Sequence, residues 1–157
     1  VQFNWRPAPG CWSIGDCLAH LNAVDSLDAD LLEAAVRQAR AKGLTGDGPF
    51  RYSPVTGWLI RSLEPPPRFR TRAPRIYLPP PGQPMLKIRG DFIRIHDRLI
   101  DIAGLAEGLR LTRVKVPAPF IPWLKFSFTQ RMRLIAAHDR RHLWQAWQVP
   151  STPGFPT

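Results

Sequence analysis

The residues in this sequence best suited to chemistry are its histidines, of which two stand one helical turn apart. His138 and His142 have the i, i+4 spacing that puts both imidazoles on one face of a helix, about 6 Å apart. Two ring nitrogens at that separation can bind one divalent metal ion at bond lengths of about 2.0–2.1 Å. His20 falls on the apolar face of another expected helix. Three inward-facing imidazoles need partners, and a shared metal ion would supply one.

Other interpretations of these histidines stay open. An H-x-x-x-H pair also occurs on solvated helix faces, and a single buried histidine such as His20 is often just hydrogen-bonded within a core. His96 has the weakest case for a role in the site, because it can equally face Asp97 or solvent. The same residues therefore also fit a non-catalytic bundle.

Polar side chains near the three histidines are candidates for orienting a ligand or contacting a substrate. They are Gln145, Asp16, Arg131 and His96. Gln145 follows His142 by three residues and is placed to hold a ligand ring or a water molecule. Arg131 lies on nearly the same helix face as His138, so a contact with an anionic substrate is plausible on spacing alone.

Hydrolysis at such a site would require a general base as well. Asp16 precedes His20 by one turn and Asp139 adjoins His138, so both are candidates. Each also has a structural interpretation. Asp16 suits a helix cap, and Asp139 suits a surface ion pair with a neighbouring arginine.

Three long amphipathic helices are expected to position these residues, over 13–42, 84–108 and 122–148. Ser13 and Asp16 match a capping box at the start of the first, and Trp12 before them suits a hydrophobic staple. Apolar residues recur at three- and four-residue steps in all three. The sequence therefore predicts an all-α, up-and-down helical bundle.

The connections between these helices are rich in proline. Residues 44–83 are predicted to be loop-like, with a short helix over 54–62 and an extended, partly polyproline stretch after it. Residues 109–123 are expected to cross the bundle, with at most a single short strand. Residues 1–150 are predicted to form one domain, followed by a flexible tail over 151–157.

Composition excludes several classes of protein. The chain has 157 residues, of which 44% are hydrophobic and 22% charged, and these values are ordinary for a globular domain. No apolar run approaches the about 20 residues that a membrane-spanning helix needs. The only two cysteines, Cys11 and Cys17, are expected to be reduced thiols of a cytoplasmic protein.

A net charge of +10 raises the question of nucleic-acid binding. The densest basic segment carries arginines at 68, 70, 72 and 75 around Phe69, which could contact phosphates and stack on bases. The other arginines are scattered, and no nucleic-acid-binding motif is present. The sequence therefore argues against a nucleic-acid partner.

Two stretches of the chain resemble motifs of one known family. WRPAPGCWSIGDCLAHL, residues 5–21, resembles the Trp-Ser-helix signature of the DinB-like four-helix-bundle metalloproteins, and AAHDRRHLWQA, residues 136–146, resembles their closing H-x-x-R-H-x-x-Q motif. The resemblance implies a divalent metal ion, often nickel or zinc, bound by His20, His138 and His142.

The resemblance also implies a class of chemistry. Relatives include S-transferases and isomerases that use mycothiol, bacillithiol or glutathione, so the expected activity is metal-dependent thiol transfer to a small-molecule electrophile. A low-molecular-weight thiol would be the co-substrate. The alternatives are a metal-dependent hydrolase and a non-catalytic metal-binding bundle.

The sequence departs from the family pattern at its start. The family places a helix before the Trp-Ser signature, whereas only the residues up to Trp12 stand there in this sequence. The three expected helices would then be the second, third and fourth of the family. We expect either that the first helix is truncated or that a homodimer covers the gap.

Overall fold

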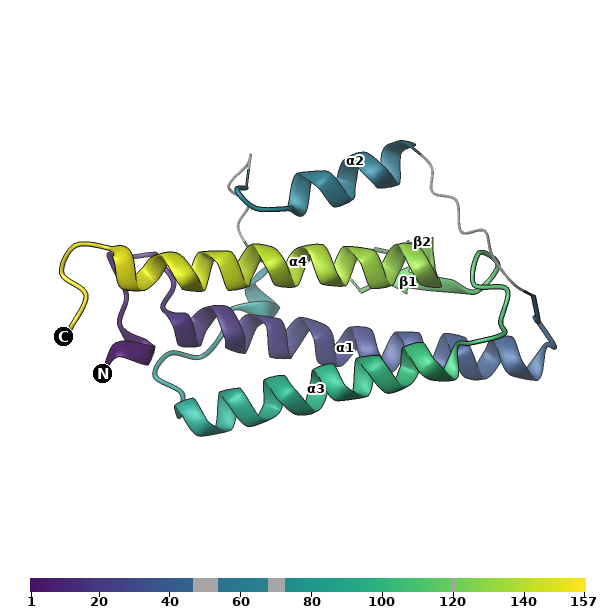
Figure 1. Cartoon of the computed structure of the whole chain (residues 1–157), viewed down its shortest axis with the longest axis horizontal. Helices are drawn as coiled ribbons and strands as arrows, with labels where there is room; N and C mark the ends of the chain where they lie inside the picture. Colours follow the sequence, from purple (N-terminus) through teal and green to yellow (C-terminus); the bar gives the residue numbers. More distant parts are fainter. Residues whose placement is uncertain (47–53, 68–72, 120) are drawn as a thin grey trace.

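The structure is a computed structural model that describes residues 1–46, 54–67, 73–119 and 121–157. Three long helices lie side by side in it: α1 (Ile14–Ala41), α3 (Met85–Leu105) and α4 (Phe128–Gln148). α1 packs against both of the others, and α4 runs antiparallel to it (Figure 1). The predicted all-α bundle is confirmed, with one small sheet added to it.

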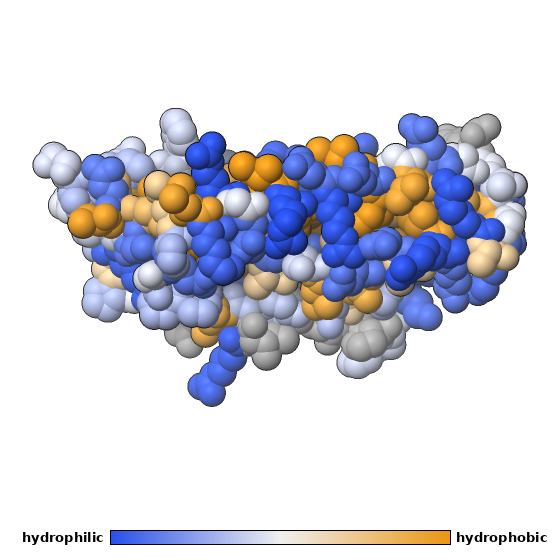
Figure 2. Space-filling model, turned by 90° about the horizontal axis from the view of Figure 1, so that it is seen from below, coloured by the Kyte–Doolittle hydropathy of each residue, from blue (hydrophilic) through white to orange (hydrophobic). Residues whose placement is uncertain are grey.

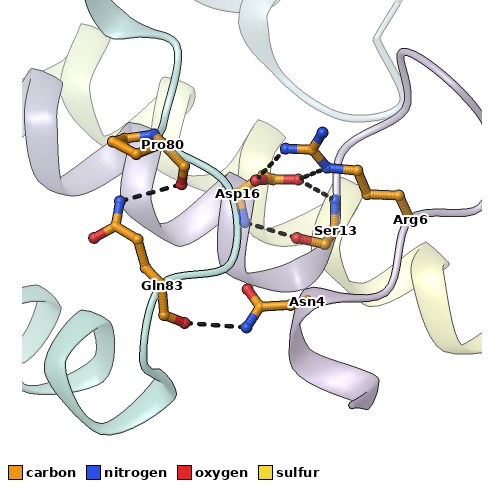
Figure 3. Close-up of polar contacts among 6 residues, drawn as sticks. All are labelled: Asn4, Arg6, Ser13, Asp16, Pro80 and Gln83. Atoms are coloured by element: carbon orange, nitrogen blue, oxygen red, sulfur yellow. Dashed lines mark hydrogen bonds and ion pairs between the residues drawn. The ribbon is translucent and has the colours of Figure 1, made fainter.

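α1 begins where the capping pattern predicts. The Ser13 hydroxyl accepts a hydrogen bond from the Asp16 amide at 3.0 Å, and the Asp16 carboxylate accepts one from the Ser13 amide at 2.9 Å. The same carboxylate also accepts two hydrogen bonds from Arg6, so that the chain before the helix is held against its first turn (Figure 3). The helix entry is therefore fixed by polar contacts on both sides of Asp16.

The predicted short helix is also present, as α2 (Pro54–Leu63). It lies over α4, on the side away from α1 (Figure 1). A small apolar cluster, with Leu59 and Ile60 packed against buried Phe126 and Leu134, joins it to the bundle.

The crossing segment differs from the prediction. It forms two antiparallel strands, β1 (Lys115–Ala118) and β2 (Ile121–Ser127), and the expected helix start near Pro122 is wrong because β2 occupies that position. The helix instead begins at Phe128, where Ser127 and Gln130 exchange the two hydrogen bonds of a capping box. This S-x-x-Q pattern is visible in the sequence and marks the true boundary.

Part of the proline-rich segment returns to α1. It contains a short 3-10 helix, η2 (Arg75–Tyr77), that contacts α1 and buries the Tyr77 side chain. Further on, the Gln83 carbonyl accepts a hydrogen bond from Asn4 (Figure 3). The basic positions 68, 70 and 72 lie outside the described residues.

The mixture of side chains that α1 buries changes along its length. Its second half contributes Leu32 and Val36 to the main apolar cluster, together with Leu99 and Ile102 of α3 and Ile135 of α4. Its first half buries the polar residues Asp16, His20 and Asp25 beside apolar ones such as Leu21 and Val24, and Asp28 follows just past the midpoint. The buried polar side chains of α1 therefore lie in its N-terminal part and at its middle.

The surface and the helix lengths bear on two predictions, which are the homodimer and the absence of a membrane-spanning helix. On the α3 side, apolar patches lie among charged side chains (Figure 2), and Leu86, Ile93 and Ile100 are exposed. The homodimer expected to cover the gap of a missing first helix stays a prediction. Among the described helices, none is both long and apolar enough to cross a membrane.

The chain ends contact each other. Before α1 the chain forms a short 3-10 helix, η1 (Gln2–Asn4), and the Gln2 side chain donates a hydrogen bond to the Pro156 carbonyl. The Trp5 and Phe155 rings meet edge to face, with centroids 5.4 Å apart. The domain boundary at residue 150 and the flexibility of 151–157 stay predictions.

Candidate metal centre

The structure brings together the three histidines that the sequence singles out. His20 comes from the second turn of α1, and His138 and His142 from the C-terminal half of α4. One ring nitrogen of each lies within 4.8 Å of the other two. The Nε2 atoms of His20 and His138 are 3.4 Å apart. Two nitrogens bound to one tetrahedral ion would be about 3.4 Å apart, given bonds of about 2.0–2.1 Å.

Two of the rings are oriented by carbonyl oxygens. The Nδ1 atom of His20 lies 2.9 Å from the Tyr77 carbonyl, and that of His142 lies 3.1 Å from the Oε1 atom of Gln145. A carbonyl oxygen only accepts, so each Nδ1 carries the proton and each Nε2 keeps its lone pair. Metal-binding histidines typically donate the second ring N–H in this way.

The Tyr77 carbonyl is a part of the site that the sequence does not reveal. It is a backbone group, far along the chain from His20, and it reaches the imidazole because η2 docks on α1. Gln145, in contrast, was predicted to hold a ligand ring, and its side chain contacts His142.

Burial keeps these imidazoles neutral. It lowers the pKa of His138 to about 3, with further lowering by the charges of His142 and His20. Burial and the charge of His20 likewise lower the pKa of His142 to about 4. The pKa of His20 is also lowered, again mainly by burial. All three are therefore unprotonated at neutral pH, which is the state that binds metal ions.

These pKa shifts predict an acid-sensitive fold in the metal-free protein. Between pH 6.5 and pH 4 the unfolded chain protonates His138 and His142 while the folded chain does not. The free energy of unfolding should fall as the pH is lowered, by about 1.4 kcal/mol per pH unit for each such histidine. Urea unfolding in the presence of a chelator, at several pH values, would measure this slope. A His138→Gln chain should show a shallower slope, and equal slopes would contradict the prediction.

An indole ring forms one side of the centre. The Trp12 ring stacks on the His142 imidazole with centroids 5.4 Å apart and an interplanar angle of 28°. Its centroid lies 4.9 Å from that of His20. The residue expected as a staple for α1 thus also packs against two of the three imidazoles.

Asp16 and Arg131, two of the residues predicted to orient a ligand or contact a substrate, form other contacts. Both carboxylate oxygens of Asp16 are bonded to Arg6, and one of them also to the Ser13 amide, in the cap of α1. Arg131, interpreted as a substrate contact, instead pairs with Asp28, with Nε–Oδ1 and Nη2–Oδ2 distances of 2.7 and 2.6 Å. This ion pair is buried, since Asp28 is 1% and Arg131 12% exposed.

The other two predictions concern Asp139 and His96, which lie together. Asp139 is not a surface partner of an arginine, because it is only 13% exposed and its Oδ2 atom is 3.4 Å from His96 Nε2. Its neighbour Arg140 pairs with Glu64 instead. His96 therefore belongs to a separate cluster and does not join the three histidines.

Removing the oxygen that orients His142 should weaken metal binding. A Gln145→Leu substitution is expected to lower zinc affinity about 10- to 100-fold, as is usual when an outer partner of a ligand is lost. Competition titration with a fluorescent zinc chelator would measure the change. Gln148→Leu, at an exposed position on the same helix, is the matched control and should leave the affinity unchanged.

Comparison with known proteins agrees with this geometry. The DinB superfamily matches the chain over residues 2–146, a range that contains all three histidines. No curated protein and no solved structure matches the chain.

Proposed function

This chain belongs to the DinB superfamily, and we propose that His20, His138 and His142 hold one divalent metal ion in it, zinc or nickel. The observation that carries the proposal is the convergence of three neutral imidazoles, two of them with Nδ1–H donated to a carbonyl oxygen. The donor set fits such an ion, since imidazole nitrogens suit zinc and nickel.

Three protein ligands leave one coordination position open, as in catalytic rather than structural sites. An ion held there would lower the pKa of a thiol or a water molecule that enters the open position. Trp12 would border the bound molecule on one side, because its ring packs against His20 and His142.

Of the two reactions, we propose thiol transfer rather than hydrolysis. Hydrolysis needs a base beside the water molecule. Asp16 is bonded to Arg6 and Ser13, and Asp139 faces His96, so the bases that the sequence offered are engaged. These contacts support a reaction in which the nucleophile is already an anion.

The thiol would come from solution. Cys17 is buried, and burial raises the pKa of its thiol to about 12, so it is not a nucleophile near neutral pH. The positive charge of Arg141 acts on the site, since it contributes to lowering the pKa of His138 and His142. A field of that sign favours a low-molecular-weight thiol bound as its thiolate. The second substrate would be a small electrophile.

The test combines metal content with turnover. Purified protein loaded with zinc or nickel would be supplied with glutathione, bacillithiol or mycothiol and with a chlorinated aromatic compound or an epoxide. Loss of the electrophile that requires both the thiol and His138 would support the proposal. Cleavage of an ester or amide without thiol would favour a hydrolase, and a loaded protein inactive in both assays would favour a non-catalytic bundle.

A further inference from the structure

A second group of potential metal ligands lies between the three long helices. Asp25 of α1, His96 of α3 and Asp139 of α4 each place one ligand atom within 4.8 Å of the others. The Nε2 atom of His96 is 3.4 Å from Asp139 Oδ2 and 3.9 Å from Asp25 Oδ2. None of these residues is one of the three clustered histidines.

Asp25 is a buried carboxylate that needs a hydrogen-bond donor or a cation. It is completely buried, and neither of its carboxylate oxygens has a hydrogen-bond partner within the described part of the chain. The Oδ1 atom of Asp139 is also buried and unpartnered there. Buried carboxylates without partners are costly, and proteins usually pair them with a cation or a donor.

His96 directs one ring nitrogen at both carboxylates. Its Nδ1 atom lies 2.9 Å from the Phe92 carbonyl, which can only accept, so Nδ1 carries a proton and Nε2 faces the two carboxylates. The Phe92 ring packs on the imidazole with centroids 4.0 Å apart and keeps it in place. The contact with Asp139 raises the pKa of His96, so the two carboxylates attract positive charge to this position, which either a proton or a bound cation can supply. When Nε2 carries no proton, three lone-pair donors face one small region.

The nearby guanidinium of Arg131 is paired with a carboxylate outside this cluster. Arg131 is committed to Asp28, with both Nε and Nη2 bonded to that carboxylate. Burial, together with the charges of Asp139 and Asp28, raises the pKa of Asp25, and the Arg131 charge only partly offsets this. A cation held between Asp25 and Asp139 would therefore stabilise both carboxylates.

Solvent can reach the cluster. A cavity of about 260 Å³ lies between α3 and α4, with His96 and Asp139 in its wall. The rest of the wall is largely apolar, including Leu99, Met132 and Ile135. An ion would thus have an entry path, and the surrounding apolar groups would strengthen its attraction to the carboxylates.

We propose that Asp25, His96 and Asp139 form a second divalent-cation site, independent of the three histidines. Two carboxylates and one imidazole make a harder donor set than three imidazoles, so this site suits Mn²⁺ or Fe²⁺ better than the first does. Three protein ligands from three helices would also tie the bundle together at this level.

The test uses Mn²⁺ as the probe, monitored by electron paramagnetic resonance. The folded His142→Ala chain, in which the three-histidine site is disrupted, should still bind Mn²⁺. Adding Asp25→Asn or His96→Gln should weaken that binding at least 10-fold. Asp101→Asn, an exposed carboxylate on α3, is the matched control and should have no effect.

Asp25→Asn keeps the shape of the side chain, and circular dichroism would confirm that the variant folds. Mn²⁺ binding that is undetectable at millimolar concentration, or that persists unchanged in both variants, would overturn the proposal. This test is independent of the proposed function. A chain that loses zinc through His138→Ala should still bind Mn²⁺, whether or not the turnover assays detect activity.

Discussion

Replacing His138 by alanine should lower the zinc that stays with the protein after dialysis by about one ion per chain. His138 lies close to both of its partners, with its Nε2 atom 3.4 Å from that of His20 and its ring centroid 4.6 Å from that of His142. Loss of a ligand should cost more than the about 100-fold that loss of an outer partner can cost. Elemental analysis beside a competition titration would measure both quantities.

Trp147→Ala is the matched control for this experiment. It truncates a side chain that is 79% exposed on the same helix and lies outside both groups of potential metal ligands. Zinc content should therefore stay near that of the unmodified chain. Full zinc retention by the His138→Ala chain would show that the three imidazoles do not act together.

The second large effect concerns stability. Arg131→Met should lower the free energy of unfolding by about 3–5 kcal/mol, because it leaves the carboxylate of Asp28 buried without its partner. Asp28 is 1% exposed, so water cannot replace the lost guanidinium without a local opening. Urea unfolding at neutral pH would measure the loss.

Two further variants isolate the cause. Arg94→Met removes an arginine that is 71% exposed and pairs with Asp91, so it should cost less than about 1 kcal/mol. The double variant Arg131→Met/Asp28→Leu should recover much of the stability, since it removes the stranded charge as well. If the double variant is no more stable than Arg131→Met alone, the loss arises from packing and not from an unpaired carboxylate.

The helices and the three histidines were predictable because their signals are local. The capping box at Ser13 fixes the start of α1, and the position of His20 relative to that start decides which way its ring faces. The wrong start of α4 has a similar origin. Pro122 suits a first helical turn, but the capping pattern at Ser127 is the stronger signal and the preceding residues pair with β1.

The remaining parts of the site depend on contacts between distant segments. The residue types do not predict that the Tyr77 carbonyl contacts His20, because that contact depends on the path of the proline-rich segment. Asp25 and Asp28 did leave a signal. They lie on the same face of α1 as Leu21, Val24 and Leu32, where a carboxylate needs a partner.

The unequal distribution of side chains along α1 has a consequence for how the protein opens. Its second half is held by the main apolar cluster, whereas its first half also buries imidazoles and carboxylates that a bound cation would link. Without metal, amide protons near His20 should exchange with solvent through local fluctuations, while those near Leu32 should await global unfolding. Metal binding would then slow amide exchange chiefly around His20. The half of α1 that the apolar cluster holds would not need to change.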